Sequence, residues 1–306
     1  MRQAYRTGIR PLEEHYNFPF FFSPVLNDVD IEVCISMLSK RSPVPPVLPA
    51  HLVLSSVLFR HTPQAKPFVL LLGQYSVGKT SFINHLLGSG RGYPGSHVGP
   101  EPTTDRFTAI MHGEEERVLP GNMVSASADK PFAGLAKFGN AFLSKFSCAE
   151  VNSEILKGVT LVDTPGVLAG EKQRVGRDYD MTEVTQWFAE RSDIIMLVFD
   201  AHKLDISDEF KDVIAHLRGH EDKIRIVLNK SDHVTPKQLL RVHGALMWSL
   251  GRFFQTPEVC RVYISSFWDA PYAPISGAAA ATLFDSEKSD LFDDLRDIPR
   301  YAAVRR

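Results

Sequence analysis

The octapeptide GQYSVGKT, residues 73–80, constrains the fold more than any other feature of the chain. It fits the pattern GxxxxGK[ST] and lies between an apolar run, PFVLLL, and a helix-like segment, SFINHLL. In that context the glycines let the backbone curl so that its N–H groups and the helix N-terminus face phosphate oxygens. The sequence therefore predicts a phosphate loop, rather than a chance glycine-rich turn, made of Gly73, Gln74, Tyr75, Ser76, Val77, Gly78, Lys79, Thr80 and Ser81.

The pattern of elements around this loop indicates an α/β fold. Apolar runs at 68–72, 159–162, 194–199 and 224–228 are each followed by a polar loop and a helix-like segment. Such alternation is typical of a mostly parallel sheet with helices on both faces. Within the loop, Lys79 is expected to reach the β and γ phosphates of a nucleotide, and the Thr80 hydroxyl is expected to bind Mg²⁺.

A second motif, DTPG at residues 163–166, follows the apolar run GVTLV. Asp163 would then emerge at the carboxyl end of a strand, where open α/β sheets bind ligands, and would hold magnesium through water. Gly166 can offer its N–H to the γ-phosphate, which makes the loop through Lys172 a nucleotide-sensing switch. Alone, the motif could equally be an Asp-initiated turn.

The third motif is NKSD, residues 229–232, after the strand-like KIRIVL. Asp232 can accept hydrogen bonds from N1–H and the exocyclic amine of guanine, while Asn229 and Lys230 would tie this base loop to the phosphate loop. From chemistry alone the three motifs together predict GTP.

A candidate first switch, GPEPTTD at residues 99–105, lies between the first two motifs. Thr104 offers a hydroxyl to the γ-phosphate and magnesium; a proline-ordered surface turn is the alternative. Thr80 and Asp163 are 83 positions apart, which predicts a large insertion between the switches.

Composition limits the partners. The 306 residues carry a formal charge of −2, which argues against a basic nucleic-acid-binding protein. The N-terminus lacks the apolar core of a signal peptide, and no run reaches the roughly 20 apolar residues that span a bilayer. We therefore expect a cytoplasmic protein, which would contact membranes only from their cytoplasmic side.

Longer runs resemble a known family. GQYSVGKTSFI, VGPEPTTDRFTAIMHG, DTPGVLAGEKQR, WFAERSDIIMLVFDAHKLDISDEF, HEDKIRIVLNKSD and GALMWSLG are similar to the EHD family of dynamin-related membrane-remodelling ATPases, as is YRTGIRPLEEHY. The resemblance implies a dynamin-type G domain, ATP rather than GTP despite NKSD, assembly on curved anionic membranes, and a peripheral location on endosomal or plasma membrane in endocytic recycling.

The resemblance also implies roles for individual residues. It assigns Lys79, Thr104 and Ser76 to catalysis, Thr80, Thr104 and Asp163 to magnesium, and the phosphate loop, Gly166, Asn229, Lys230 and Asp232 to the nucleotide. Trp248 corresponds to a tryptophan on the helix through which the family forms homodimers; a core tryptophan is the alternative. DKPF, residues 129–132, resembles a mobile loop that contributes to oligomer contacts, against the alternative of a surface turn.

The resemblance divides the chain into four parts. Residues 1–32 would be an N-terminal helical arm, 33–65 an atypical Pro/Ser-rich insert that is disordered, 66–290 the nucleotide-binding domain, and 291–306 the start of a helical domain. The family's lipid-binding tip and EH domain have no counterpart in this sequence, so we expect the chain not to remodel membranes.

The expected reaction is slow. Small GTPases orient the attacking water with a Gln after DTPG, whereas this chain has Val167 there. Thr104 is the expected substitute once dimerisation orders the switches, and His202 and His233 are expected to be surface histidines. Two alternatives remain open from the sequence: a GTP-dependent signalling switch without membrane remodelling, and a nonfunctional truncated product.

Overall fold

The structure is a computed structural model that describes residues 66–88, 92–96, 106–127, 129–167, 179–254, 260–268 and 271–305. Lys66–Pro299 forms one compact unit, which holds all three sequence motifs. The predicted arm at 1–32 and the predicted disordered insert at 33–65 lie outside the described residues.

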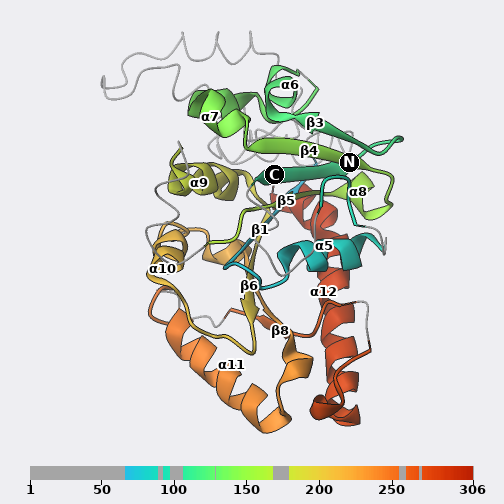
Figure 1. The fold of residues 1–306 in the computed structure, drawn as a ribbon, viewed down its shortest axis with the longest axis vertical. Coiled ribbons are helices and arrows are strands. Elements are labelled where there is room, and N and C mark those ends of the chain that lie inside the picture. The colour runs from blue at the N-terminus through green and yellow to red at the C-terminus, as the bar shows by residue number, and fades with distance from the viewer. Residues whose placement is uncertain are drawn as a thin grey trace, which may run out of the picture. The chain divides into compact units, whose positions relative to one another are not determined.

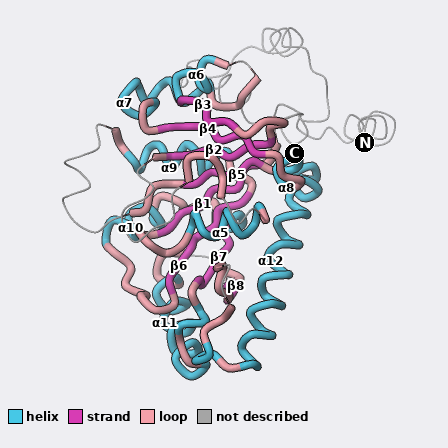
Figure 2. The backbone as a smooth tube through the Cα atoms, turned by 45° about the vertical axis from the view of Figure 1, so that its right-hand side comes forward, coloured by secondary structure: helices cyan, strands magenta, loops and turns pink. Residues whose placement is uncertain are grey.

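The compact unit is organised around one sheet, in which the described residues contribute eight strands in the order β3-β4-β2-β5-β1-β6-β7-β8 (Figure 2). Neighbours are parallel except β2 with β5 and β3 with β4. The mostly parallel sheet predicted from the sequence is therefore confirmed. The strands are β1 (Phe68–Gly73), β2 (Phe107–His112), β3 (Arg117–Pro120), β4 (Phe146–Val151), β5 (Thr160–Asp163), β6 (Ile194–Asp200), β7 (Ile224–Asn229) and β8 (Val262–Ile264).

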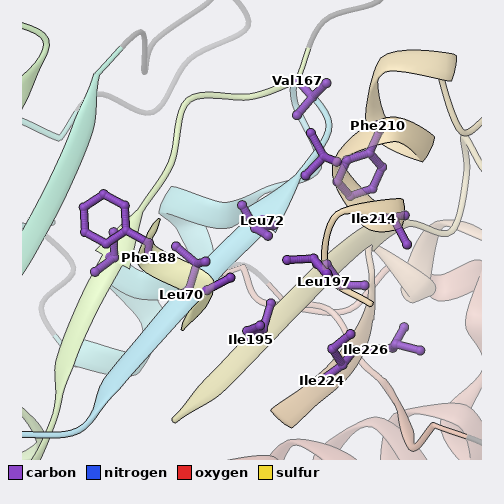
Figure 3. Close-up of a cluster of buried hydrophobic side chains, with 14 of the residues drawn as sticks. Leu70, Leu72, Val167, Phe188, Ile195, Leu197, Phe210, Ile214, Ile224 and Ile226 are labelled. Atoms are coloured by element: carbon purple, nitrogen blue, oxygen red, sulfur yellow. The ribbon is translucent and has the colours of Figure 1, made fainter. Parts of the chain in front are cut away.

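Both faces of the sheet are covered, which explains why the central strands are apolar along their whole length. Successive side chains of a strand point to opposite faces, so Leu70 and Leu72 of β1 enter one hydrophobic cluster and Val69 and Leu71 the other. Figure 3 shows part of the first cluster, in which Leu70 lies beside Phe188 and Leu72 lies further along β1.

The helices form two layers (Figure 1). α9 (Met181–Arg191), α10 (Asp208–Ala215) and α11 (Pro236–Leu250) pack on the first cluster, and α5 (Lys79–Leu87) and α8 (Ile155–Gly158) pack on the second. Local signals fix their starts: Asp180 and Ser207 cap α9 and α10, and Thr235 forms a capping box with Gln238 at α11. The remaining short elements are α6 (Gly121–Ala126), α7 (Gly139–Leu143), η3 (Ala133–Phe138), η5 (Glu221–Lys223), η6 (Ser231–His233) and η7 (Pro274–Ser276).

α12 (Ala278–Arg305) is the longest described helix, and its residues belong to both hydrophobic clusters. Phe284, near its start, belongs to the first cluster, whereas Leu291, Leu295 and Ile298 belong to the second. The boundary predicted at residue 290 therefore falls inside one helix. Among the described residues, no helix is long and apolar enough to cross a membrane.

The chain between Thr80 and Asp163 builds one end of the sheet. It supplies β2, β4 and β3, so the large insertion predicted from the spacing is a set of strands and short helices rather than a long loop. Within it, Phe132 is fully buried and stacks on Phe68, with ring centroids 5.7 Å apart. The surface turn considered for DKPF therefore does not describe Phe132, which is a core residue.

Candidate functional site

The phosphate loop joins the end of β1 at Gly73 to the start of α5 at Lys79, as its sequence predicts. Ser76 and Gly78 have left-handed backbone conformations, with φ of 64° and 90°. A left-handed conformation in a non-glycine residue such as Ser76 is strained, and such residues cluster at functional sites. A Cβ at Gly78 would lie 2.4 Å from Nδ2 of Asn229, so only glycine lets the base loop approach this closely.

Lys79 is buried at the centre of the loop. Its Nζ donates to the carbonyl oxygens of Gly73 and Gln74, each at 3.1 Å, and Lys79 as a whole is 6% exposed. Burial lowers the pKa of the Lys79 ammonium to about 8, although the nearby Asp163 carboxylate opposes that shift. The ammonium is thus held inside the curl of the loop, a position that suits contact with phosphate.

Thr80 and Asp163 meet across the gap between α5 and the end of β5. The Thr80 hydroxyl donates to Oδ2 of Asp163 at 2.8 Å, and Asp163 is fully buried. Within the described part of the chain, Oδ1 of Asp163 is buried and has no hydrogen-bond partner. Burial raises the pKa of the Asp163 carboxyl, while Lys79, the hydroxyls of Thr80 and Tyr93 and the backbone N–H of Thr164 lower it. A buried carboxylate oxygen without a donor, next to a threonine hydroxyl, fits a divalent cation that prefers oxygen ligands.

Tyr93 also contacts this carboxylate, which the sequence motifs do not predict. Its hydroxyl donates to Oδ2 of Asp163 at 2.9 Å. Burial, followed by the carboxylate itself, raises the pKa of Tyr93 well above its ordinary value, so the phenol stays protonated and acts as a donor. The segment around Tyr93 matches no motif of the site, and only its place in the fold reveals the contact.

The DTPG segment is bonded to the phosphate loop. The Tyr75 N–H donates to the Val167 carbonyl at 3.0 Å, and the Val167 N–H donates to the Gly73 carbonyl at 3.2 Å. A Cβ on Gly166 would lie 2.7 Å from Cα of Tyr75, so the contact requires glycine. The Val167 side chain is 3% exposed and packs in the first cluster (Figure 3). This side chain is therefore part of the hydrophobic core.

The base loop is tied to the phosphate loop by two side chains. Nδ2 of Asn229 donates to the Val77 carbonyl at 2.8 Å, and Nζ of Lys230 donates to the Ser76 carbonyl at 2.6 Å. Lys230 Nζ also donates to Asp200 at the end of β6, at 2.7 Å. These bonds form the connection that the sequence predicts for Asn229 and Lys230. They also include Asp200, which the sequence motifs do not predict.

Asp232 is held by a backbone donor from another segment of the chain. Its Oδ2 accepts the backbone N–H of Ala273 at 3.1 Å, and the side chain is 8% exposed. In the described chain its other oxygen, Oδ1, is buried and has no hydrogen-bond partner. One carboxylate oxygen is therefore occupied and the other is buried.

Several predicted residues lie elsewhere. Thr104 and the chain from 168 to 178, which holds most of the predicted second switch, lie outside the described residues. Ser81 follows Thr80 on α5 and is half-buried. His202 and His233 are exposed, as expected of surface histidines. Trp248 lies on α11 and is 71% exposed, so the alternative of a core tryptophan is wrong.

Comparison with known proteins identifies the family. A model described as "Dynamin family" matches residues 69–231, a range that contains the phosphate loop, DTPG and nearly all of the base loop. The chain belongs to the dynamin family. The predicted dynamin-type G domain is thereby confirmed. A second model, described as "N-terminal EH-domain containing protein", matches residues 1–32.

The chain is also similar to individual EH domain-containing proteins. The chain is 52% identical over 307 residues to EH domain-containing protein 1 of Arabidopsis thaliana and 49% identical over 306 residues to EH domain-containing protein 2 of Homo sapiens. Both alignments cover 100% of this chain and 50% of the relative, so the chain spans about half the length of these relatives. The resemblance to the EHD family is confirmed.

Solved structures give a more distant likeness. A chain of an oligomerised bacterial dynamin pair has 18% identity and a TM-score of 0.47, over 83% of this chain and 44% of that one. Toc33 from Arabidopsis thaliana has 14% identity and a TM-score of 0.45, over 81% and 87%. A likeness of this size says nothing about activity.

Proposed function

We propose that residues 66–299 bind and slowly hydrolyse ATP with Mg²⁺, as the nucleotide-dependent part of a membrane-trafficking mechanoenzyme. The observation that carries the proposal is the convergence of Lys79, the Thr80–Asp163 pair and the base loop at one edge of the sheet. Residues from three separate motifs meet there, as a site that holds phosphates, Mg²⁺ and a base requires.

The proposed roles follow from these contacts. Thr80 and Asp163 would hold magnesium, with Thr104 as a third proposed ligand, and the cation would supply positive charge to the phosphates of the bound nucleotide. Lys79 would stabilise the charge that develops on the γ-phosphate, together with backbone N–H groups of the loop from Gly73 to Ser81. Gly166 of the DTPG motif would offer its N–H to the γ-phosphate. We propose Ser76 and Thr104 as further catalytic residues.

The contacts of Asp232 support ATP over GTP. Guanine recognition by a carboxylate uses both of its oxygens, one for N1–H and one for the exocyclic amine. Here Ala273 already donates to Oδ2, and Oδ1 is buried. Guanine would have to share Oδ2 with this backbone donor and reach the buried Oδ1, whereas adenine makes no such demand on the carboxylate. ATP is therefore the nucleotide that we propose.

Slow hydrolysis and a role for dimerisation belong to the same proposal. Val167 is buried in the core at the position where small GTPases have the Gln that orients the attacking water. The monomer therefore lacks a water-orienting side chain at this position. The exposed face of α11 formed by Leu240, Gly244 and Trp248 suits contact with a second copy, since Leu240 and Trp248 are 75% and 71% exposed. A homodimer through this face would order the switches. The setting that we propose for the whole protein is the cytoplasmic surface of endosomal or plasma membrane.

Isothermal titration calorimetry tests the nucleotide site. ATP and GTP are titrated into the protein with Mg²⁺ and with EDTA, and the same is done for Lys79→Ala and Thr80→Ala. We expect Lys79→Ala to abolish binding and Thr80→Ala to lose only the gain that Mg²⁺ gives, because Thr80 acts through the cation. Lys157→Ala, on the exposed helix α8, is the control and should bind as the unmodified chain does.

Two results would count against the proposal. Unchanged binding by both variants would remove the phosphate-loop assignment. Tenfold tighter binding of GTP, about 1.4 kcal/mol, would reverse the choice of base and leave the rest in place.

A further inference from the structure

The turn around Tyr93 is built to hold one side chain in place. Gly92 and Gly95 have left-handed backbones, with φ of 75° and 85°, and the Ser96 N–H closes the turn on the Tyr93 carbonyl at 2.9 Å. A Cβ on Gly92 would lie 2.4 Å from Oγ of Ser96 and 3.0 Å from Nδ2 of Asn84 on α5. The turn therefore fits closely against α5, the helix that carries Thr80.

The Tyr93 side chain enters the second cluster from this turn and ends at Asp163. Tyr93 is 3% exposed, and its hydroxyl donates to the same oxygen, Oδ2, that accepts the Thr80 hydroxyl. Two donors at 2.8 and 2.9 Å fix the orientation of the carboxyl group. The other oxygen is left without a donor among the described residues.

Cation binding depends on how the ligands are held. Groups that hydrogen-bond a metal ligand fix its orientation, and losing one typically lowers metal affinity by about 10- to 100-fold. Asp163 has a short side chain at the end of β5, and the donors on its Oδ2 come from two other segments, Thr80 on α5 and Tyr93 on its turn. Removing the Tyr93 hydroxyl would leave Thr80 as the remaining hydroxyl donor to Oδ2, and Thr80 is itself a proposed ligand.

We propose that Tyr93 is a positioning residue for magnesium, whose hydroxyl holds Asp163 in the orientation that binds the cation. The inference rests on the proposed function, because it names a further residue for the same cation site. Tyr93 acts through Asp163 and touches neither nucleotide nor cation.

The test is Tyr93→Phe, which removes one oxygen and keeps the packed ring. The gain in affinity that Mg²⁺ gives is measured by titrating ATP with Mg²⁺ and with EDTA, and Mn²⁺ binding to the nucleotide-bound protein is measured by electron paramagnetic resonance. We expect the Mg²⁺ gain to fall about tenfold and Mn²⁺ to bind correspondingly more weakly, with ATP affinity in EDTA unchanged.

The control is Tyr263→Phe. Tyr263 is also buried and donates its hydroxyl to an aspartate, but that aspartate is Asp294 on α12 rather than Asp163. The Tyr263→Phe substitution should lower thermal stability without changing the gain in ATP affinity that Mg²⁺ gives. A second variant, Gly92→Ala, displaces the turn while keeping the phenol, and it should lose the Mg²⁺ gain as well.

The outcomes separate this inference from the proposed function. An unchanged or larger Mg²⁺ gain in Tyr93→Phe would overturn the role of Tyr93, as would an equal loss of affinity with and without Mg²⁺. A chain with its natural Tyr93 that gains nothing from Mg²⁺ would overturn the proposed function itself.

Discussion

Burial of Lys79 should give nucleotide binding a distinctive pH dependence. In the free protein the pKa of this ammonium is lowered to about 8, and phosphate favours its charged form. Below pH 8 the group is charged in both states, so affinity is at its full value. Above pH 8 the free protein loses the proton and must take it up again to bind, so affinity falls as pH rises, by up to about tenfold per pH unit.

Calorimetry in two buffers of different ionisation enthalpy measures this proton uptake directly. We expect nearly none at pH 7 and an uptake that approaches one proton at pH 9. Affinity that stays flat from pH 7 to 9.5 would show that Lys79 is charged throughout.

Ala273 offers a way to change the base preference without touching the base loop. Its φ is −61°, which a proline adopts, so Ala273→Pro should remove the N–H that donates to Asp232 while keeping the backbone. Asp232 Oδ2 would then be free, and guanine could supply the missing donor. We expect the affinity for GTP relative to ATP to rise about tenfold, the scale of one hydrogen bond to a charged group.

Competition binding with a fluorescent nucleotide measures this ratio. Ala273→Gly keeps the N–H and should leave the ratio unchanged. If Ala273→Pro also leaves it unchanged, the Ala273–Asp232 bond does not decide the base.

These residues mark how far the sequence could predict the site. Lys79, Thr80, Asp163 and Asn229 could be predicted because side-chain chemistry at fixed spacing is written in the sequence. The bond from Ala273 to Asp232 could not, since any residue but proline has a backbone N–H. Tyr93 matches no motif, and its contact depends on the fold bringing its turn against α5.

At the scale of elements, apolar runs predicted some strands and missed others. The runs at 68–72, 159–162, 194–199 and 224–228 correspond to β1, β5, β6 and β7, which lie next to one another and are covered on both faces. β4 is equally buried but contains Ser147 and Glu150, which interrupt the run. Glu150 is tolerated there because Arg117 and Lys130 both pair with it. Ion pairs from distant segments are invisible to a pattern of hydrophobicity.

The exposed face of α11 makes a prediction about assembly. Trp248→Glu places a charge at the centre of the proposed contact between two copies, so we expect the dimer dissociation constant to rise at least about tenfold. Sedimentation equilibrium with Mg²⁺ and ATP measures it. Met123→Glu, on α6 and also exposed, is the matched control and should dimerise normally. A Trp248→Glu protein that dimerises as well as the control would exclude α11 as the contact.

At the scale of the whole molecule, α12 sets where the nucleotide-binding unit ends. Leu291, Leu295 and Ile298 are each 1–2% exposed, and burying one such side chain contributes about 1.5–3 kcal/mol. Their sum is several kcal/mol, a large part of the roughly 5–15 kcal/mol that stabilises a domain. A fragment of residues 66–299 should therefore melt cooperatively, and one of residues 66–290 should melt at least about 10 °C lower.

Differential scanning calorimetry of the two fragments provides the measurement. Equal melting temperatures would support the boundary that the sequence predicts at 290 and would show that the end of α12 adds little to the core.

The central position of β1 has a consequence for how the protein is made. The Phe68 N–H is bonded to Asp193, 125 residues further along, and the Val77 carbonyl accepts from Asn229, 152 residues further along. At about 5–20 residues per second, a ribosome takes roughly 8 to 30 s to add that length. Until then the FVLLLG segment is outside the ribosome without all of its partners, so we expect chaperones to bind it. Nucleotide can assist folding only after the base loop at Asn229 has been synthesised.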